Sequence, residues 1–287
     1  MTKKLRGVFT ALVTPFHQGE VDFECFRALC RRQLAAGIAG LVPCGTTGET
    51  PTLTPQEWEK LIAIAVEESG GSVPVIAGCG TNATHSTIQN IRRAKALGAD
   101  AGLIVFPYYN KPNPEGLVAH ITEAGKEDFP MVLYHVPGRT GQRLSANILE
   151  RLCRLPNVIG LKEATGDVTL GQELCNRLAD TNVALLSGDD FTYAALCTMG
   201  FDGVISVLSN PAPALSVEWC HAAHQGNIAR LQELRNLLFP VVETLFSATN
   251  PLPCKEIMQR QGLMSSEARL PLLATSSLSD SDWSFLK

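Results

Sequence analysis

The chain has 287 residues, of which 45% are hydrophobic and 18% are charged, a composition typical of a globular protein and not of a disordered chain. Lys and Arg number 24 against 28 for Asp and Glu, so the formal net charge is −4. No basic stripe stands out that could neutralise a run of phosphates, which argues against nucleic acid as a partner.

The N-terminal segment does not resemble a secretory signal. Its apolar stretch is interrupted by Thr10, Thr14, Pro15 and His17, and no signal-type cleavage site follows. No apolar run elsewhere reaches the ~20 residues of a membrane helix. We therefore expect a cytoplasmic protein with no membrane partner.

Eight short apolar runs recur through the first 210 residues, and we predict that they are β-strands. They are rich in Val and Ile and lack strict polar alternation, which is typical of strands buried on both faces of a parallel sheet. The runs cover residues 7–16, 40–46, 73–80, 101–108, 131–137, 158–165, 183–189 and 203–210.

Between these runs, apolar residues return every three or four positions, which predicts amphipathic helices. Thr54, Pro55 and Glu57 suit the N-cap, first turn and third position of a capping box, and Gly37 and Gly98 suit helix ends. The predicted helices cover residues 22–36, 54–68, 84–97, 114–126, 145–155, 169–178 and 191–199.

Strands that start about 20 to 33 residues apart and alternate with helices predict an α/β fold, a (β/α)8 TIM barrel. An open doubly wound sheet is the alternative, and it is disfavoured because no glycine-rich dinucleotide loop follows the first run. Three further helical stretches, at residues 215–224, 227–245 and 253–261, exceed one closing helix. We therefore predict a barrel domain of residues 1–225 and a small C-terminal helical extension of residues 226–287 packed on it.

The nine cysteines, at positions 25, 30, 44, 79, 153, 175, 197, 220 and 254, form no CxxC pair and no Cys/His cluster of zinc-finger spacing. An odd number also does not suit a disulfide framework. We interpret them as small buried hydrophobic residues, with a metal site or a redox pair as the alternative.

Catalytic residues of such a barrel lie where the strands end and the βα-loops begin. Lys162 stands in the apolar sixth run, where an ammonium ion that points into the barrel loses its hydration. Loss of hydration favours the neutral amine, which can attack a ketone to form an imine. A lysine that reaches the barrel rim or pairs with Glu163 is the alternative, and the residues alone leave both open.

Other candidates stand at the ends of neighbouring runs. The phenol of Tyr134, one strand away from Lys162, could pass protons, although plain packing is the alternative. Thr46 and Thr47 form either an ordinary turn or a loop that offers N–H and hydroxyl groups to a carboxylate. Arg139 is either a surface charge or the planar fork that holds a second carboxylate.

Six motifs, in register and in order, resemble the dihydrodipicolinate synthase / N-acetylneuraminate lyase family from about residue 5 to the C-terminal helices. A single motif would be weak evidence, whereas six in order make chance similarity improbable. They are GTTGE at 45–49, YYNKP at 108–112, LYHVPGRTG at 133–141, GLKEATG at 160–166, SGDD at 187–190 and GVISV at 203–207.

The resemblance implies catalytic roles for four residues. Lys162 matches the family's Schiff-base lysine, and Tyr134 matches its proton donor and acceptor. Thr46 matches the threonine that links this tyrosine to a second one. The second tyrosine matches Tyr109, which in the family reaches into the neighbouring subunit's site.

The resemblance also implies substrate contacts. Thr47 and Ile205 match residues that touch bound pyruvate, and Arg139 matches the arginine that receives the second substrate's carboxylate. Sialic-acid lyases and sugar-acid aldolases of the family lack this arginine, so Arg139 favours the other branch. One residue departs from that branch, because His135 stands where the arginine-bearing members usually have asparagine.

The implied activity is therefore a lyase that condenses pyruvate with L-aspartate 4-semialdehyde in lysine and diaminopimelate biosynthesis, as a homotetramer of tight dimers, with no cofactor and no metal. Two alternatives stay open. One is a retro-aldolase, such as N-acetylneuraminate lyase or a 2-keto-3-deoxy sugar-acid aldolase. The other is an inactive barrel that only binds a ligand.

Overall fold

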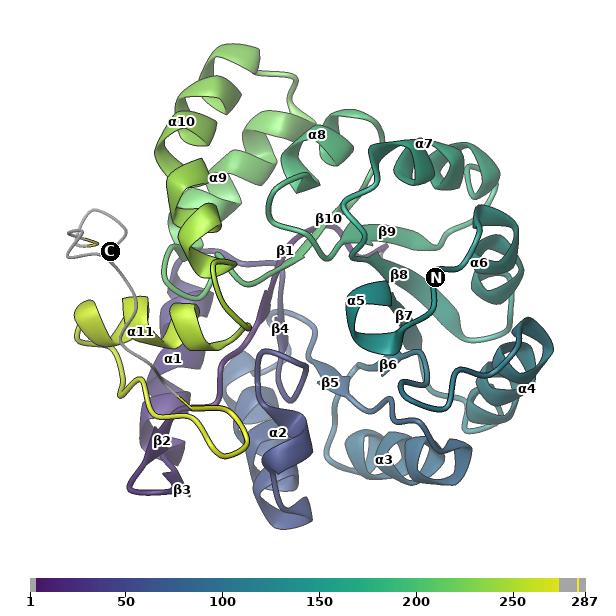
Figure 1. Cartoon of the computed structure of the whole chain (residues 1–287), viewed down its shortest axis with the longest axis horizontal. Helices are drawn as coiled ribbons and strands as arrows, with labels where there is room; N and C mark the ends of the chain where they lie inside the picture. Colours follow the sequence, from purple (N-terminus) through teal and green to yellow (C-terminus); the bar gives the residue numbers. More distant parts are fainter. Residues whose placement is uncertain (1–3, 274–282, 284–287) are drawn as a thin grey trace.

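The computed structural model describes residues 4–273 and residue 283. Eight parallel strands form one sheet in the order β4 (Gly40–Val42), β1 (Gly7–Ala11), β10 (Gly203–Ser206), β9 (Ala184–Ser187), β8 (Val158–Glu163), β7 (Met131–His135), β6 (Ala101–Val105) and β5 (Ile76–Gly78). An isolated parallel bridge between Leu41 of β4 and Val75, the residue before β5, links the two edges, so the sheet closes on itself. Strands surround the centre and helices surround the strands (Figure 1). The predicted (β/α)8 barrel is confirmed.

The barrel strands are shorter than the predicted runs, because each run continues into a βα-loop whose residues, apart from the exposed Tyr108, are also buried or partly buried. A hairpin of β2 (Phe16–His17) and β3 (Glu20–Val21) was not predicted, since its turn residues Gln18 and Gly19 carry only a weak hairpin signal.

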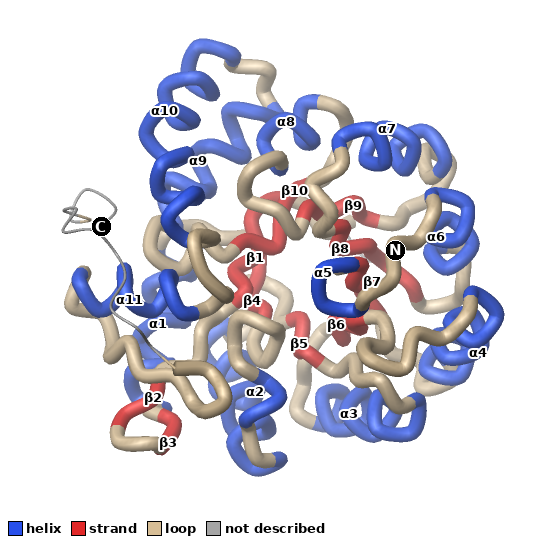
Figure 2. Tube along the Cα trace, viewed as in Figure 1, coloured by secondary structure: helices blue, strands red, loops and turns tan. Residues whose placement is uncertain are grey.

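Each predicted helix is present within a few residues of its predicted bounds (Figure 2). The capping box is confirmed: the Thr54 hydroxyl accepts from the Glu57 N–H at 3.2 Å, and the Glu57 carboxylate accepts from the Thr54 N–H at 2.8 Å. Two short helices, η1 (Thr50–Thr52) and α5 (Pro137–Thr140), were not predicted.

The longer helices are α1 (Phe23–Ala35), α2 (Pro55–Ser69), α3 (Thr84–Ala96), α4 (Pro114–Gly125), α6 (Ala146–Cys153), α7 (Val168–Arg177), α8 (Tyr193–Thr198), α9 (Pro213–His224), α10 (Ile228–Leu245) and α11 (Leu252–Arg260). No helix in the described ranges is both long and apolar enough to span a bilayer. Residues 274–282 and 284–287 of the predicted extension lie outside the described residues.

Side chains alternate along the strands and so divide the core in two. A large cluster fills the space between strands and helices, and a smaller one fills the barrel. The smaller cluster contains Tyr134 and Ile205, two of the predicted site residues. Its members are Phe9, Ala11, Val42, Ile76, Ala101, Leu103, Val132, Tyr134, Ala184, Leu186 and Ile205.

All nine cysteines lie in the described part of the chain as free thiols, and seven of them are buried. The interpretation as small buried residues is therefore confirmed for those seven. Cys25 and Cys175 are half-buried.

Candidate active site

Lys162 and Tyr134 lie side by side inside the barrel. The parallel register of β7 and β8 pairs Tyr134 with Lys162, and the lysine Nζ lies 4.2 Å from the centroid of the tyrosine ring. Both side chains are almost inaccessible, with exposed fractions of 5% for Lys162 and 6% for Tyr134. The adjacency expected from neighbouring strands is therefore present, and Lys162 does not reach the barrel rim.

Glu163, which the sequence left open as a partner of Lys162, has other partners. Its carboxylate is fully buried, lies 3.1 Å from His135 Nδ1, and accepts from the Thr165 hydroxyl at 2.9 Å. The Leu144 N–H donates to His135 Nε2, so His135 Nδ1 carries the hydrogen that is donated to Glu163. Consecutive strand residues face opposite sides of the sheet, so this pair lies on the other face from Lys162.

The amine of Lys162 has no hydrogen bond or ion pair within the described ranges. Its aliphatic stem passes close to Gly188, directly after β9. A Cβ atom at Gly188 would stand 2.8 Å from Lys162 Cε and 2.7 Å from Ala164 Cβ, closer than packed atoms approach. Gly188 therefore leaves the room that the lysine side chain needs, a role that the SGDD motif did not reveal.

The loop that carries Thr46 and Thr47 is held in an unusual backbone shape. Cys44 and Glu49, the residues flanking it, adopt left-handed φ angles of 57° and 54°, which non-glycine residues rarely do. Backbone strain of this kind persists only where surrounding contacts fix it, and it concentrates at functional sites. Thr47 is buried and Thr46 is partly exposed.

Contacts from the C-terminal part of the chain hold this loop. Glu49 is 2% exposed. One of its carboxylate oxygens accepts from the Lys255 ammonium, and the other accepts from the backbone N–H of Arg269 at 3.1 Å. The Lys255 ammonium also donates to the Glu267 carbonyl at 2.6 Å. The guanidinium of Arg269 makes a two-pronged contact with Glu57 at 2.6 and 2.7 Å.

Asn250, just before α11, joins two of the predicted substrate-binding residues. Its side-chain N–H donates to the Thr47 hydroxyl at 3.0 Å, and its carbonyl accepts from Arg139 Nη2 at 3.2 Å. The side-chain oxygen of Asn250 is buried without a hydrogen-bond partner. No motif or periodicity in the sequence indicated this contact, because Asn250 lies 203 positions from Thr47.

Asp190, the last residue of the SGDD motif, fixes the end of β10 beside Ile205. Its carboxylate accepts from the Ser206 hydroxyl at 2.6 Å and from the N–H groups of Val207 and Leu208 at 2.8 and 3.0 Å. Burial raises the pKa of the Asp190 carboxyl, against these hydrogen bonds. Asp190 therefore has a structural role, which is to hold the end of β10 in place.

A cavity of about 550 Å³ opens beside Tyr134 and the loop that carries Thr46. Its wall includes Thr46, Tyr134, Arg139 and Asn250. Lys162 does not line the cavity itself but lies against the Tyr134 ring. Tyr134 therefore stands between the lysine and a space large enough for small polar substrates.

Tyr109 is the predicted site residue that the single chain does not bring to the others. Its side chain is 90% exposed, it does not line the cavity, and its φ angle of 72° lies in the left-handed region. Tyr108, its neighbour, does line the cavity. A bulky residue with positive φ is strained, and no hydrogen bond or ring contact of Tyr109 with residues 4–273 offsets this strain.

The sequence matches the model of the Dihydrodipicolinate synthetase family over residues 4–282. It is 44% identical over 269 residues to a protein named 4-hydroxy-tetrahydrodipicolinate synthase from Thermomicrobium roseum, and this alignment covers 93% of the chain and 89% of the relative.

Solved structures agree. The chain is 38% identical to a chloride-inhibited dihydrodipicolinate synthase from Acinetobacter baumannii in complex with pyruvate, with a TM-score of 0.92 over 96% of this chain and 94% of that one. It is 41% identical to a protein described as the first monomeric dihydrodipicolinate synthase variant, with a TM-score of 0.92 over 95% and 92% of the two chains. The chain therefore belongs to the dihydrodipicolinate synthetase family.

Proposed function

We propose that this chain is a 4-hydroxy-tetrahydrodipicolinate synthase, a class I lyase that condenses pyruvate with L-aspartate 4-semialdehyde. The observation that carries the proposal is the buried amine of Lys162, 4.2 Å from the ring centroid of Tyr134 and beside the cavity. Relatives that bear this name align with over nine-tenths of the chain, and the relative crystallised with pyruvate supports pyruvate as the first substrate.

In the proposed reaction, the neutral amine of Lys162 attacks the keto carbon of pyruvate, and the carbinolamine loses water to form an imine. Loss of a methyl proton gives an enamine, because the protonated imine accepts the electron pair. The enamine carbon then attacks the aldehyde carbon of the second substrate. The amino group of that substrate displaces Lys162 as the ring closes, which regenerates the lysine.

The remaining site residues take supporting roles in this proposal. Tyr134 transfers protons during formation and loss of the carbinolamine, with Thr46 as its hydrogen-bonding neighbour. Thr47 and Ile205 contact pyruvate, and Arg139 binds the carboxylate of the aldehyde substrate. Thr46, Tyr134 and Arg139 all line one cavity, which supports this assignment.

We also propose that Tyr109 completes the site of a neighbouring chain, within a homotetramer of tight dimers. Its 90% exposure and strained backbone support a partner beyond the single chain. Mixing Tyr109→Phe chains with Lys162→Ala chains should restore activity that neither variant has alone, because each subunit would then serve the other. The absence of any restoration would refute the shared site but not the chemistry.

The division into a barrel of residues 1–225 and an extension of residues 226–287 is likewise a proposal. Asn250 and Lys255 both bind the loop that carries Thr46 and Thr47, which supports an extension that shapes the site and is not an independent unit. The cytoplasm remains the compartment that we expect from the sequence.

The experiment that tests the function offers three acceptors in turn with pyruvate: L-aspartate 4-semialdehyde, N-acetylmannosamine and glyceraldehyde. We expect aspartate semialdehyde to give the highest kcat/KM, because only its carboxylate needs Arg139. A preference for either sugar aldehyde would identify a retro-aldolase instead. No turnover with any acceptor would indicate a barrel that only binds ligands.

A further inference from the structure

Two helices bring three metal-ligating side chains together away from the catalytic cavity. Cys197 lies in the last turn of α8, and Cys220 and His224 lie one turn apart at the end of α9. Both helices run from the carboxyl ends of the strands back to their amino ends, as the connections of this fold require. The three side chains therefore lie at the end of the barrel opposite to the Tyr134 cavity.

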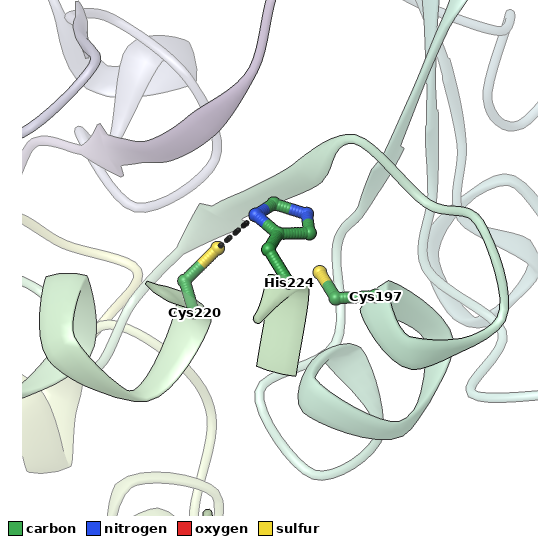
Figure 3. Close-up of side chains that lie close together, drawn as sticks. All are labelled: Cys197, Cys220 and His224. Atoms are coloured by element: carbon green, nitrogen blue, oxygen red, sulfur yellow. Dashed lines mark hydrogen bonds between the residues drawn. The ribbon is translucent and has the colours of Figure 1, made fainter. Parts of the chain in front are cut away.

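The spacing of the three ligand atoms is close to that of a zinc site. The two Sγ atoms and the imidazole nitrogen all lie within 4.8 Å of one another, and Cys220 Sγ lies 3.9 Å from His224 Nδ1 (Figure 3). Zinc bonds of about 2.3 Å to sulfur and 2.0–2.1 Å to nitrogen place tetrahedral ligand atoms roughly 3.5–3.8 Å apart. Movements of about 1 Å or less would bring the three side chains to that geometry.

The imidazole of His224 is already oriented as a ligand. Its Nε2 lies 3.1 Å from the Phe201 carbonyl, which can only accept, so Nε2 carries the hydrogen. Nδ1 therefore bears a free lone pair, and Figure 3 shows that it faces Cys220. A metal-binding histidine typically donates its second ring nitrogen to a carbonyl in this way, because that contact fixes the tautomer and the ring orientation.

The environment of Cys220 differs from that of the other buried cysteines. Burial raises the thiol pKa of Cys30 and Cys153 to about 12. By contrast, the contacts of Cys220 with Cys197 and His224 lower the pKa of its thiol, and the contact with Cys220 raises the pKa of the Cys197 thiol.

We propose that Cys197, Cys220 and His224 bind one Zn²⁺ ion per chain. The ligands are the two Sγ atoms, whose protons are released to solvent, and His224 Nδ1. Water fills the fourth position, because His224 is only half-buried. Two thiolates favour Zn²⁺ over Mg²⁺ or Ca²⁺, which prefer oxygen. Such an ion would tie α8 to α9 and would take no part in the reaction of Lys162.

The test uses Co²⁺ as a spectroscopic probe on the full-length chain, after treatment with a chelator and a reductant. We expect visible absorption of tetrahedral Co²⁺ and a sulfur-to-metal charge-transfer band, both saturating at one ion per chain and both abolished by Zn²⁺. Cys220→Ser and His224→Asn should each weaken binding at least about 100-fold, because each removes a ligand. Cys153→Ser, a change of an equally buried thiol, should leave the spectrum unaltered.

Three results would overturn the proposal. The first is a folded, reduced, unsubstituted chain that shows no tetrahedral Co²⁺ bands, and this outcome does not depend on whether any variant folds. The second is an equal spectrum in Cys220→Ser. The third is a Cys197–Cys220 disulfide in the purified chain with no Co²⁺ uptake after reduction, which would identify a redox pair instead.

Discussion

The cations beside the candidate active-site cavity and the cations at the junction with the C-terminal segment differ in their partners. At the junction, Lys255 pairs with Glu49, and Arg269 pairs with Glu57. Beside the cavity, the Lys162 amine lies on the ring of Tyr134, and Arg139, in the cavity wall, donates only to a backbone carbonyl within the described ranges. Paired cations hold the fold, whereas cations without carboxylate partners are available to react with or bind a substrate.

The difference is greatest between the two buried lysines, Lys255 and Lys162. Lys255 is fully buried, and burial lowers the pKa of its amine while Glu49 opposes that change. Lys162 is 5% exposed, and no carboxylate pairs with its amine in the described part of the chain. An amine that is not held in an ion pair is available to act as a nucleophile.

The largest effect is expected from Lys162→Met. Turnover should fall by about 10³-fold or more, because no other amine replaces the nucleophile. The free energy of unfolding should stay the same or rise, since the change removes a buried polar group without breaking an ion pair. Steady-state kinetics and urea unfolding of the same preparation measure both. A strongly destabilised variant would mean that Lys162 is a structural residue.

Lys255→Met should have the opposite effect on the free energy of unfolding. It leaves Glu49 buried without its cation, so we expect the free energy of unfolding to fall by about 3–5 kcal/mol. The matched control is the double variant Lys255→Met/Glu49→Gln, which removes both charges and should recover part of the loss. If the single and double variants are equally unstable, the ion pair does not explain the stability.

Arg139→Ala should raise KM for aspartate semialdehyde far more than for pyruvate. The lost contact is a charge-assisted hydrogen bond to a carboxylate, worth about 1.5–3 kcal/mol, or roughly 10- to 150-fold in kcat/KM. Arg92→Ala, at an exposed pair with Glu127, is a control that should change neither KM. Equal effects of Arg139→Ala on both substrates would count against its assignment.

The smallest effect concerns pH. Hydrogen bonding to Arg269 lowers the pKa of the Glu57 carboxyl to about 2, against about 4.5 for a free glutamate. Because the pKa is lower in the folded state, the pair stabilises the protein above about pH 4.5, and this stabilisation is lost as the pH falls towards 2. Arg269→Ala should therefore destabilise by about 1–3 kcal/mol at neutral pH, with urea midpoints converging on those of the unsubstituted chain at low pH. A gap that is independent of pH would exclude this ion pair as its source.

The sequence predicted features that depend on neighbouring strands. Lys162 and Tyr134 were placed side by side because consecutive strands of a barrel are adjacent, and the register of β7 and β8 agrees. Continuous apolar runs likewise predicted every barrel strand, although not where each one ends. These features are local, or follow directly from the order of the elements.

Contacts between distant segments were not predictable in this way. Asn250 meets Thr47 across 203 positions, and Lys255 meets Glu49 across 206. Cys197 joins Cys220 and His224 only because α8 and α9 end at the same place. Such contacts depend on how the last helices pack, for which a single sequence carries no periodic signal.

The central claim is that Lys162 forms the covalent intermediate, and reductive trapping tests it most directly. The chain is incubated with pyruvate and borohydride, its intact mass is measured, and the modified peptide is sequenced. We predict one reduced pyruvate per chain, located on Lys162, and no added mass in Lys162→Ala. Trapping that persists in Lys162→Ala, or a label on Lys255 or any other residue, would contradict the assignment.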